Sequence, residues 1–226
     1  MDEQTLDAYL FPGSDELRSY SASFESRARD RFVALVNDLF DLGSHEEYQK
    51  MFFSDRIMLQ KKNRRLLDYI EVQTFLDRIE IISLNEEVTK HLFKIIPAEK
   101  GFADYKYDAA AHRITIPLPA LSMNALLEMR DSVDGKFNSV KKAFGLVRAQ
   151  TAQQVKAGIE NEFIFQVDAA KVSKEIELVM AHYLDHAMVF AMAKKAIIMG
   201  KYKPKDKQEF ELFNQVPAAV KLLNSS

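Results

Sequence analysis

Residues 169–199 read AAKVSKEIELVMAHYLDHAMVFAMAKKAIIM, and their apolar pattern predicts one long helix. Seven successive apolar residues, Ala187 to Ala193, leave this part of the helix without a polar face. A helix that is apolar all round is covered by its neighbours in the folded protein. We therefore expect this helix to run through the centre of the fold, with the rest of the chain packed around it.

The segment before residue 97 contains mostly helical signals. Apolar residues at helical spacing predict a helix over 24–42, and Gly43 is a natural C-terminal stop. Ser44, followed by Glu47 three residues later, forms a capping box that opens another helix. The apolar residues of 54–96 are also mostly at helical spacing, although the EIISL piece within them could instead be a short strand.

The strand signal is strongest over residues 102–117, where two alternating runs of polar and apolar residues predict a β-hairpin. A third alternating run, 162–167, could supply a third strand, because an isolated hairpin is only marginally stable. Helices are expected after Ser122 and over about 139–157. The predicted fold class is α+β: predominantly α-helical, with a small antiparallel sheet packed on the long central helix 169–199.

Length and composition place this chain among ordinary globular proteins. Its 226 residues are 47% hydrophobic and 28% charged, and they predict a single domain over 1–226 with a soft division near 97–101. The absence of cysteine excludes disulfides, thiolate metal sites and a cysteine nucleophile. The acidic start lacks the features of a secretory signal, and no uncharged stretch is long enough to span a bilayer. We expect a cytoplasmic protein without membrane association.

Several enzyme classes are excluded by missing motifs. No two glycines are spaced for a dinucleotide fingerprint or a phosphate-binding loop, and there is no Gly-x-Ser-x-Gly elbow. No glutamate precedes a histidine by three residues, as the di-iron carboxylate bundles require. The sequence thus favours a non-enzymatic protein with no cofactor.

Two histidines, His182 and His186, lie one turn apart on the same face of the central helix. This spacing can supply two zinc ligands, but the acidic residue between them is Asp185, shorter than the glutamate of the zinc-peptidase motifs. The alternative is a pair of neutral, half-buried imidazoles bonded to a carbonyl or a carboxylate. In that case, acid below about pH 6 should loosen the helix, because a buried pair resists protonation.

A second candidate for catalysis is Asp104-Tyr-Lys106, which resembles half of a metal-dependent nuclease site. Alternation along a strand would put both side chains on one face. The competing interpretation is a solvated sheet face whose charges pair across strands with Arg113.

Two windows are strongly basic in a chain whose net charge is only −2. The first cluster, 56–65, has five positive and no negative charges; the second cluster, 194–207, has six lysines and one aspartate. Such residues with nearby amides and an aromatic ring are the types that hold phosphates and stack on bases. The predicted nucleic-acid-binding residues are Arg56, Lys61, Lys62, Arg64, Arg65, Lys194, Lys195, Lys201, Tyr202, Lys203, Lys205 and Lys207.

Three functions follow from these features. The first is a non-enzymatic binding protein that holds RNA, DNA or another polyanion through both basic clusters. The second is a structural or assembly protein whose apolar C-terminal segment, 208–224, docks on another copy or on a partner. The third is a metal-dependent hydrolase or nuclease that uses the histidine pair or Asp104 and Lys106.

Overall fold

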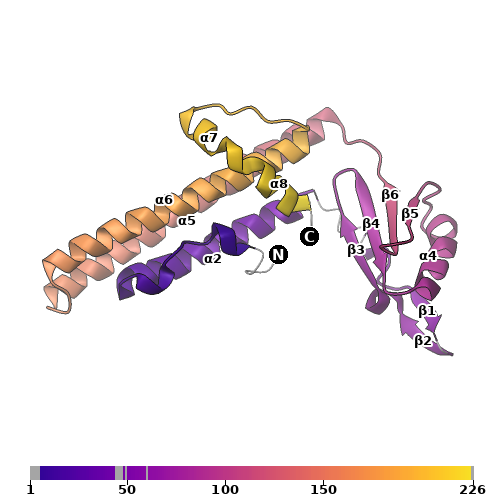
Figure 1. Cartoon of the computed structure of the whole chain (residues 1–226), viewed down its shortest axis with the longest axis horizontal. Coiled ribbons are helices and arrows are strands. Elements are labelled where there is room, and N and C mark those ends of the chain that lie inside the picture. Colours follow the sequence, from indigo (N-terminus) through magenta and orange to yellow (C-terminus); the bar gives the residue numbers. More distant parts are fainter. Residues whose placement is uncertain (1–5, 44–47, 49, 60, 225–226) are drawn as a thin grey trace. The chain divides into compact units, whose positions relative to one another are not determined.

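A computed structural model of the chain describes residues 6–43, 48, 50–59 and 61–224 (Figure 1). The chain divides into two compact units: unit 1 comprises Met1–Leu42 and Leu126–Ser226, and unit 2 comprises Gly43–Ala125. Unit 2 is therefore an insertion between two parts of unit 1. The predicted fold class, α+β and predominantly helical, is confirmed. The boundaries of the units do not fall near 97–101, and the single domain over 1–226 stays a prediction.

Unit 1 is built from three long helices with short helices packed on them (Figure 1). The helix α2 packs along α6, and α5 and α6 are antiparallel neighbours joined by a short turn. Its elements are η1 (Asp7–Tyr9), η2 (Ser14–Glu16), α2 (Ser19–Asp41), α5 (Met123–Glu160), α6 (Gln166–Met199), α7 (Lys207–Leu212), η4 (Phe213–Gln215) and α8 (Val216–Asn224).

The central helix is where the sequence predicts it, beginning three residues earlier at Gln166 and ending before Gly200, whose φ is 72°. Six of its seven successive apolar residues are buried, and Met188 is half-buried. Phe32 of α2 packs against the rings of Tyr183 and Phe190, with centroids 5.4 and 5.8 Å apart. The continuous apolar surface of α6 is thus covered from more than one side, as expected.

The predicted helix over 24–42 is confirmed and is longer at its start. The helix α2 begins at Ser19 and ends at Asp41. Gly43 then has a φ of 82°, a left-handed conformation that glycine adopts without steric cost. The capping box of Ser44 and Glu47 lies outside the described residues.

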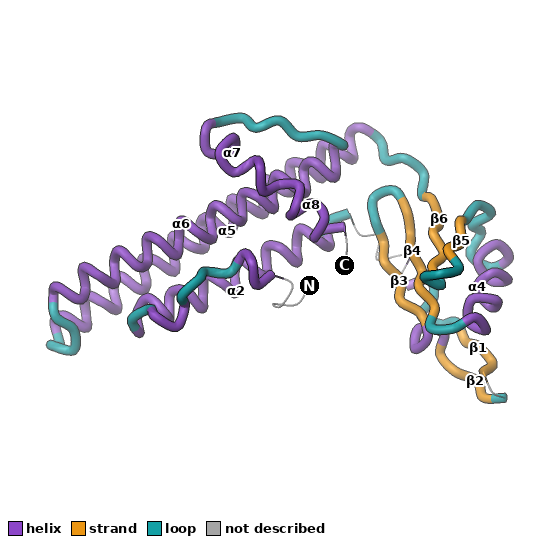
Figure 2. Tube along the Cα trace, in the orientation of Figure 1, coloured by secondary structure: helices purple, strands orange, loops and turns teal. Residues whose placement is uncertain are grey.

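The described residues of unit 2 include two antiparallel sheets, drawn in orange in Figure 2, and the helix α4, drawn in purple. A two-stranded sheet pairs β1 with β2, and a four-stranded sheet has the order β3-β4-β6-β5. Its elements are β1 (Arg56–Leu59), β2 (Lys62–Arg65), η3 (Leu66–Tyr69), β3 (Ile70–Thr74), β4 (Arg78–Ser83), α4 (Glu86–Ala98), β5 (Lys106–Asp108) and β6 (Arg113–Pro117).

The core of unit 2 lies between the four-stranded sheet and α4. Ile79 pairs with Ile116, and Ile81 pairs with Ile114, so four isoleucines share one fully buried face. Apolar side chains of α4 complete this core. The helix begins at the cap Asn85, whose side-chain oxygen accepts a hydrogen bond of 3.0 Å from the backbone N–H of Val88.

The structure corrects three expectations about the sheet. The hairpin over 102–117 is present as β5 and β6. Residues 56–83 form strands rather than helices, apart from η3, and the alternative of a short strand at EIISL is confirmed by β4. The third strand predicted over 162–167 is wrong, because the chain turns there and enters α6 at Gln166. The four-stranded sheet is completed instead by β3 and β4. It packs on α4, whereas the central helix α6 belongs to unit 1.

Candidate functional site

The first two lysines of the second cluster are buried inside unit 1. Lys194 and Lys195 are each 5% exposed. Lys194 donates a hydrogen bond of 3.3 Å to the carbonyl oxygen of Phe40, and Lys195 forms an ion pair with Asp134. Burial lowers the pKa of Lys194 to about 8, against the opposing effect of Asp41. Neither ammonium group is presented to a polyanion.

The rest of the second cluster is balanced by acidic side chains of α7. The Tyr202 hydroxyl donates a hydrogen bond of 2.8 Å to Glu209, and the same carboxylate accepts from the backbone N–H of Lys205. Lys207 pairs with Glu211 at 3.7 Å. Lys201, Lys203 and Lys205 are exposed, and they precede α7, which carries both of these glutamates.

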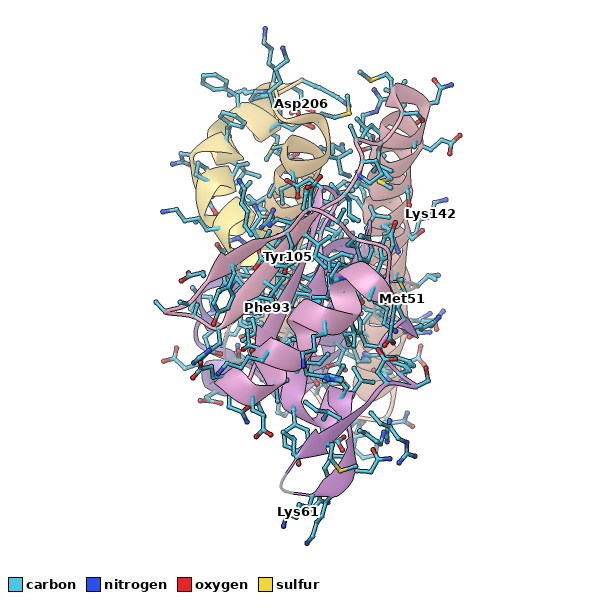
Figure 3. All side chains as sticks on the ribbon, turned by 90° about the vertical axis from the view of Figure 1, so that its right-hand side faces the viewer. Met51, Lys61, Phe93, Tyr105, Lys142 and Asp206 are labelled. Carbon is cyan, nitrogen blue, oxygen red and sulfur yellow. The ribbon has the colours of Figure 1, made fainter. Side chains whose placement is uncertain are left out.

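The first cluster forms the β1–β2 hairpin of unit 2. Both strands are short, and Lys61 lies at the turn, with a φ of 62° (Figure 3). The basic side chains Arg56, Lys61, Lys62, Arg64 and Arg65 are all exposed. In the register of the hairpin, Arg56 is directly opposite Arg65. This hairpin keeps its positive charge at the surface.

The prediction that both clusters together hold a polyanion is wrong. The two clusters belong to different units, and the second cluster has its leading lysines in the bundle interior. Sequence reasoning treated lysines at a helix end as solvated, whereas α2 and α5 supply partners that bury them.

The histidine pair lies under the N-terminal segment Leu6–Leu17. The rings of His182 and His186 are 4.4 Å apart. The Nε2 atom of His182 lies 3.1 Å from the carbonyl oxygen of Tyr9. Because a carbonyl oxygen can only accept, this hydrogen bond requires the tautomer in which Nε2 carries the proton. Tyr9 also packs edge-on against His186, at 5.4 Å between ring centroids. Through these contacts, the histidine pair packs α6 against the N-terminal segment Leu6–Leu17.

Burial lowers the pKa of His186 to about 4, and the neighbouring His182 lowers it further than burial alone would. The Nδ1 atom of His186 is buried and has no hydrogen-bond partner among the described residues. Within that part of the chain, no three His, Asp or Glu side chains gather in an arrangement that could hold a metal ion. The hydrolase prediction at this pair is therefore wrong.

The nuclease interpretation of Asp104 and Lys106 also fails. Asp104 precedes β5 and is exposed in a loop, so strand alternation does not align it with Lys106. The predicted cross-strand partner, Arg113, pairs with Glu80 of β4 at 3.3 Å. Asp108 faces Arg113 in the β5–β6 register but forms no ion pair with it among the described residues.

The C-terminal segment 208–224 packs on its own chain. It forms α7, η4 and α8, and α8 lies along α6 with Val216, Ala219 and Leu223 buried. These contacts cover one side of α8, whereas Phe210 of α7 is 73% exposed, so docking of this segment on another copy is left with one exposed aromatic side chain rather than a free apolar helix. Of the residues that the structure describes, none lies in a helix long and apolar enough to cross a membrane.

A different basic surface lies on α5. Between Asp134 and Glu160 the helix contains no acidic residue. Its solvent-facing side, called the α5 face below, is exposed along its whole length. Helical periodicity places the following residues on it: Asn138, Lys141, Lys142, Gly145, Arg148, Ala149, Ala152, Gln153 and Lys156.

The basic side chains of the α5 face differ in whether they form ion pairs with acidic residues of the chain. Within the described residues, Lys141 and Lys142 have no carboxylate at ion-pair distance; Figure 3 labels Lys142 on this helix. Arg148 pairs with Glu177 of α6, and Lys156 pairs with Glu160 at 3.8 Å. Both pairs are at least half exposed and so contribute little to stability, leaving these cations able to exchange partners. The acid-free run 135–159 is the sequence signal that was missed.

The chain is thus a two-unit α+β protein: one unit contains three long helices, and the inserted unit contains antiparallel sheets and the helix α4. No family model and no curated protein matches its sequence. One solved structure that resembles it is the solution structure of the ribosome recycling factor, 12% identical, covering 81% of this chain and 100% of that chain, with a TM-score of 0.47. Another comes from models for the T. thermophilus ribosome recycling factor and the E. coli elongation factor G bound to the E. coli post-termination complex. It is 14% identical and covers 80% of this chain and 97% of that chain, with a TM-score of 0.47. Likeness at this level does not assign a function.

Proposed function

We propose that this protein binds structured RNA within a ribonucleoprotein particle, and that the α5 face is the contact surface. The observation that supports this proposal is the 25-residue run 135–159, which carries five basic and no acidic residues on one long helix. Four of these basic residues lie on the α5 face, and the fifth, Lys136, pairs with Asp38 of α2 at 3.2 Å. Binding through one such face differs from the two-cluster hypothesis in both residues and geometry.

The composition of the α5 face suits a phosphate backbone. Lys141 and Lys142 offer exposed ammonium groups with no ion-pair partner in the described part of the chain, and cations supply most of the affinity for nucleic acid. Gly145, Ala149 and Ala152 are small, so a bulky partner can approach the helix closely. Gln153 contributes an amide, which can bond to phosphate or ribose hydroxyl groups. A rigid helix that presents charges at fixed spacing favours a structured RNA.

The ribosome is the first particle to test; one of the similar structures named above is a ribosome recycling factor described with a post-termination complex. The proposal rests on the α5 face and not on that resemblance. The β1–β2 hairpin, with its five exposed basic side chains, is a proposed additional contact from unit 2. A cytoplasmic location stays a prediction.

The test is sedimentation with purified ribosomal subunits, together with filter binding to an RNA duplex, for the wild type and for Lys141→Glu/Lys142→Glu. We expect a loss of affinity of about tenfold or more, because each phosphate contact contributes to the affinity by releasing counterions. The dependence of the affinity on salt concentration should fall as well. The matched control is Lys201→Glu/Lys203→Glu, which reverses two exposed lysines elsewhere on unit 1. Equal weakening by both variants, or none by either, would refute the α5 face as the contact surface.

A further inference from the structure

A groove of about 480 Å³ opens between the first turns of α2 and the last turns of α5. Ser19, Tyr20 and Ser23 line it from α2, and Gln154 and Asn161 line it from the end of α5. Phe163, in the turn between α5 and α6, lies at its edge. The described residues that line this groove are all uncharged, in contrast with the basic face on the same helix.

The floor of the groove is made by a close approach of α2 to α5 at Gly158. A Cβ atom on Gly158 would lie 2.6 Å from the hydroxyl oxygen of Tyr20 and 3.1 Å from Cγ2 of Ile164. Only a residue without a side chain leaves room for the Tyr20 ring at this depth. The Tyr20 ring therefore forms a fixed aromatic wall.

The rim of the groove offers a second ring and polar groups. Phe163 is 83% exposed, so one face of its ring is available for stacking. Asn161 donates a hydrogen bond of 2.7 Å from its amide nitrogen to the carbonyl oxygen of Ala157, which leaves the side-chain oxygen as an acceptor. Gln154 adds another amide. Aromatic faces with neighbouring amides recognise flat, uncharged rings with polar edges.

The groove is continuous with the α5 face. Lys142, Leu146, Gln150 and Gln154 are spaced four residues apart on α5, and all are exposed. They form one ridge that leads from the basic face into the groove. Beside this ridge, Arg27 of α2 bonds to Gln150 at 3.3 Å and to Thr151 at 2.7 Å. Its described partners are neutral oxygens, so its positive charge is not cancelled where the ridge meets the groove.

We propose that this groove binds an unpaired nucleobase of the RNA that lies on the α5 face. The base stacks on Phe163, its polar edge bonds to Asn161 and Gln154, and Arg27 holds the adjoining phosphate. This inference rests on the proposed function and names the feature of the RNA that would be selected: a bulged or single-stranded nucleotide beside a duplex.

The experiment uses the full chain and two RNA duplexes, one fully paired and one with a single bulged 2-aminopurine. We expect the wild type to bind the bulged duplex about tenfold more tightly and to quench the 2-aminopurine fluorescence by stacking. Phe163→Leu keeps an apolar side chain but removes the ring, and should reduce the affinity for the bulged duplex to that for the paired duplex. Phe210→Ala, which truncates another exposed phenylalanine of unit 1, is the matched control and should change neither.

The outcomes separate the two proposals. If Lys141→Glu/Lys142→Glu weakens both duplexes while Phe163→Leu changes nothing and the fluorescence is not quenched, the groove proposal is overturned and the α5 face stands. If neither duplex nor ribosomal subunits bind, both proposals fall. If Phe163→Leu weakens binding to ribosomal subunits but not to the bulged duplex, the groove contacts protein, and the nucleobase proposal is again overturned.

Discussion

The hydroxyl group of Tyr183 on α6 donates a hydrogen bond of 2.6 Å to the carboxylate of Glu25 on α2, and both side chains are buried. The same hydroxyl oxygen accepts a hydrogen bond of 3.3 Å from the backbone N–H of Phe11. Burial raises the pKa of Tyr183 well above its usual value, and the bond to Glu25 raises it further. A single oxygen atom thus joins two helices and the N-terminal segment of unit 1.

Removing this oxygen should destabilise unit 1. In Tyr183→Phe, the buried Glu25 carboxylate loses its closest partner among the described residues and retains Arg29, at 3.6 Å. We expect the free energy of unfolding to fall by about 1–3 kcal/mol, the usual cost of an unsatisfied buried polar group. Urea unfolding followed by circular dichroism measures it. Tyr107→Phe, at an exposed tyrosine of unit 2, is the control and should change stability by less than about 0.5 kcal/mol.

Glycines at two positions of α5 should respond differently to alanine. Gly135 has no atom within 4 Å of an added Cβ, so Gly135→Ala should stabilise the helix by about 0.5–1 kcal/mol. Gly158→Ala should not, because the added Cβ would displace the Tyr20 hydroxyl group and press on Ile164. Thermal melts of both variants test this difference. A coupling between Gly158→Ala and Tyr20→Phe in a double-mutant cycle would identify the contact, and strict additivity would contradict it.

Acid should weaken the packing of the N-terminal segment on α6. The pKa of His186 is lowered to about 4 in the folded chain, against about 6.5 in the unfolded chain, so the unfolded chain binds the extra proton between these values. Stability contributed by this group is present above about pH 6.5 and is lost as the pH falls toward 4. Allowing for partial exposure, we expect a loss of about 2 kcal/mol.

Urea unfolding at pH 7.5, 6.5, 5.5 and 4.5 measures this loss. His186→Asn removes the titrating ring and should flatten the dependence on pH over this window. His91→Gln, on α4 of unit 2, should retain the wild-type slope for unit 1. An equal slope in the wild type and His186→Asn would show that another group is responsible.

Replacing Lys194 with methionine should stabilise unit 1. A buried ammonium group is costly even with one carbonyl partner, and an apolar side chain of similar length removes that cost. We expect Lys194→Met to raise the free energy of unfolding at pH 7 by about 1–2 kcal/mol.

The gain should depend on pH in a defined direction. Because burial lowers the pKa of Lys194 to about 8 in the folded chain, wild-type stability rises as the pH increases from about 8 toward 10.5. The advantage of Lys194→Met should therefore shrink between pH 8 and pH 9.5. Lys201→Met, at an exposed position, is the control and should give no such trend. A constant advantage would contradict a charged Lys194 at neutral pH.

The sequence predicted the fold correctly where one pattern of apolar residues continued without interruption. The run Ala187 to Ala193 has no polar residue, so burial of that helix followed from the sequence. Residues 70–74 read IEVQT and also alternate, but the neighbouring Leu66 and Leu67 create an apparent helical period across the boundary. In 162–167, alternation occurs without strand partners; the hairpin is extended instead by β4, which pairs with β6, and by β3, which pairs with β4.

The candidate site was less predictable because it depends on which surfaces other elements cover. The sequence predicted that Lys194 and Lys195 are accessible. In the fold they are buried, because Phe40 of α2 and Asp134 of α5 provide partners for them. The α5 face could have been found from the absence of acidic residues between Asp134 and Glu160. The groove could not, since Tyr20 and Gly158 are brought together only by the tertiary packing of helices far apart in the sequence.

The insertion of Gly43–Ala125 into unit 1 has a consequence for the order of folding. The contacts between α2 and α6 must close a loop of well over 100 residues, which costs conformational entropy before any contact is gained. A folded insert holds its own two ends within its diameter and so shortens the effective loop. Early folding of unit 2 would therefore lower the entropic cost of the contacts between α2 and α6 and speed the assembly of unit 1.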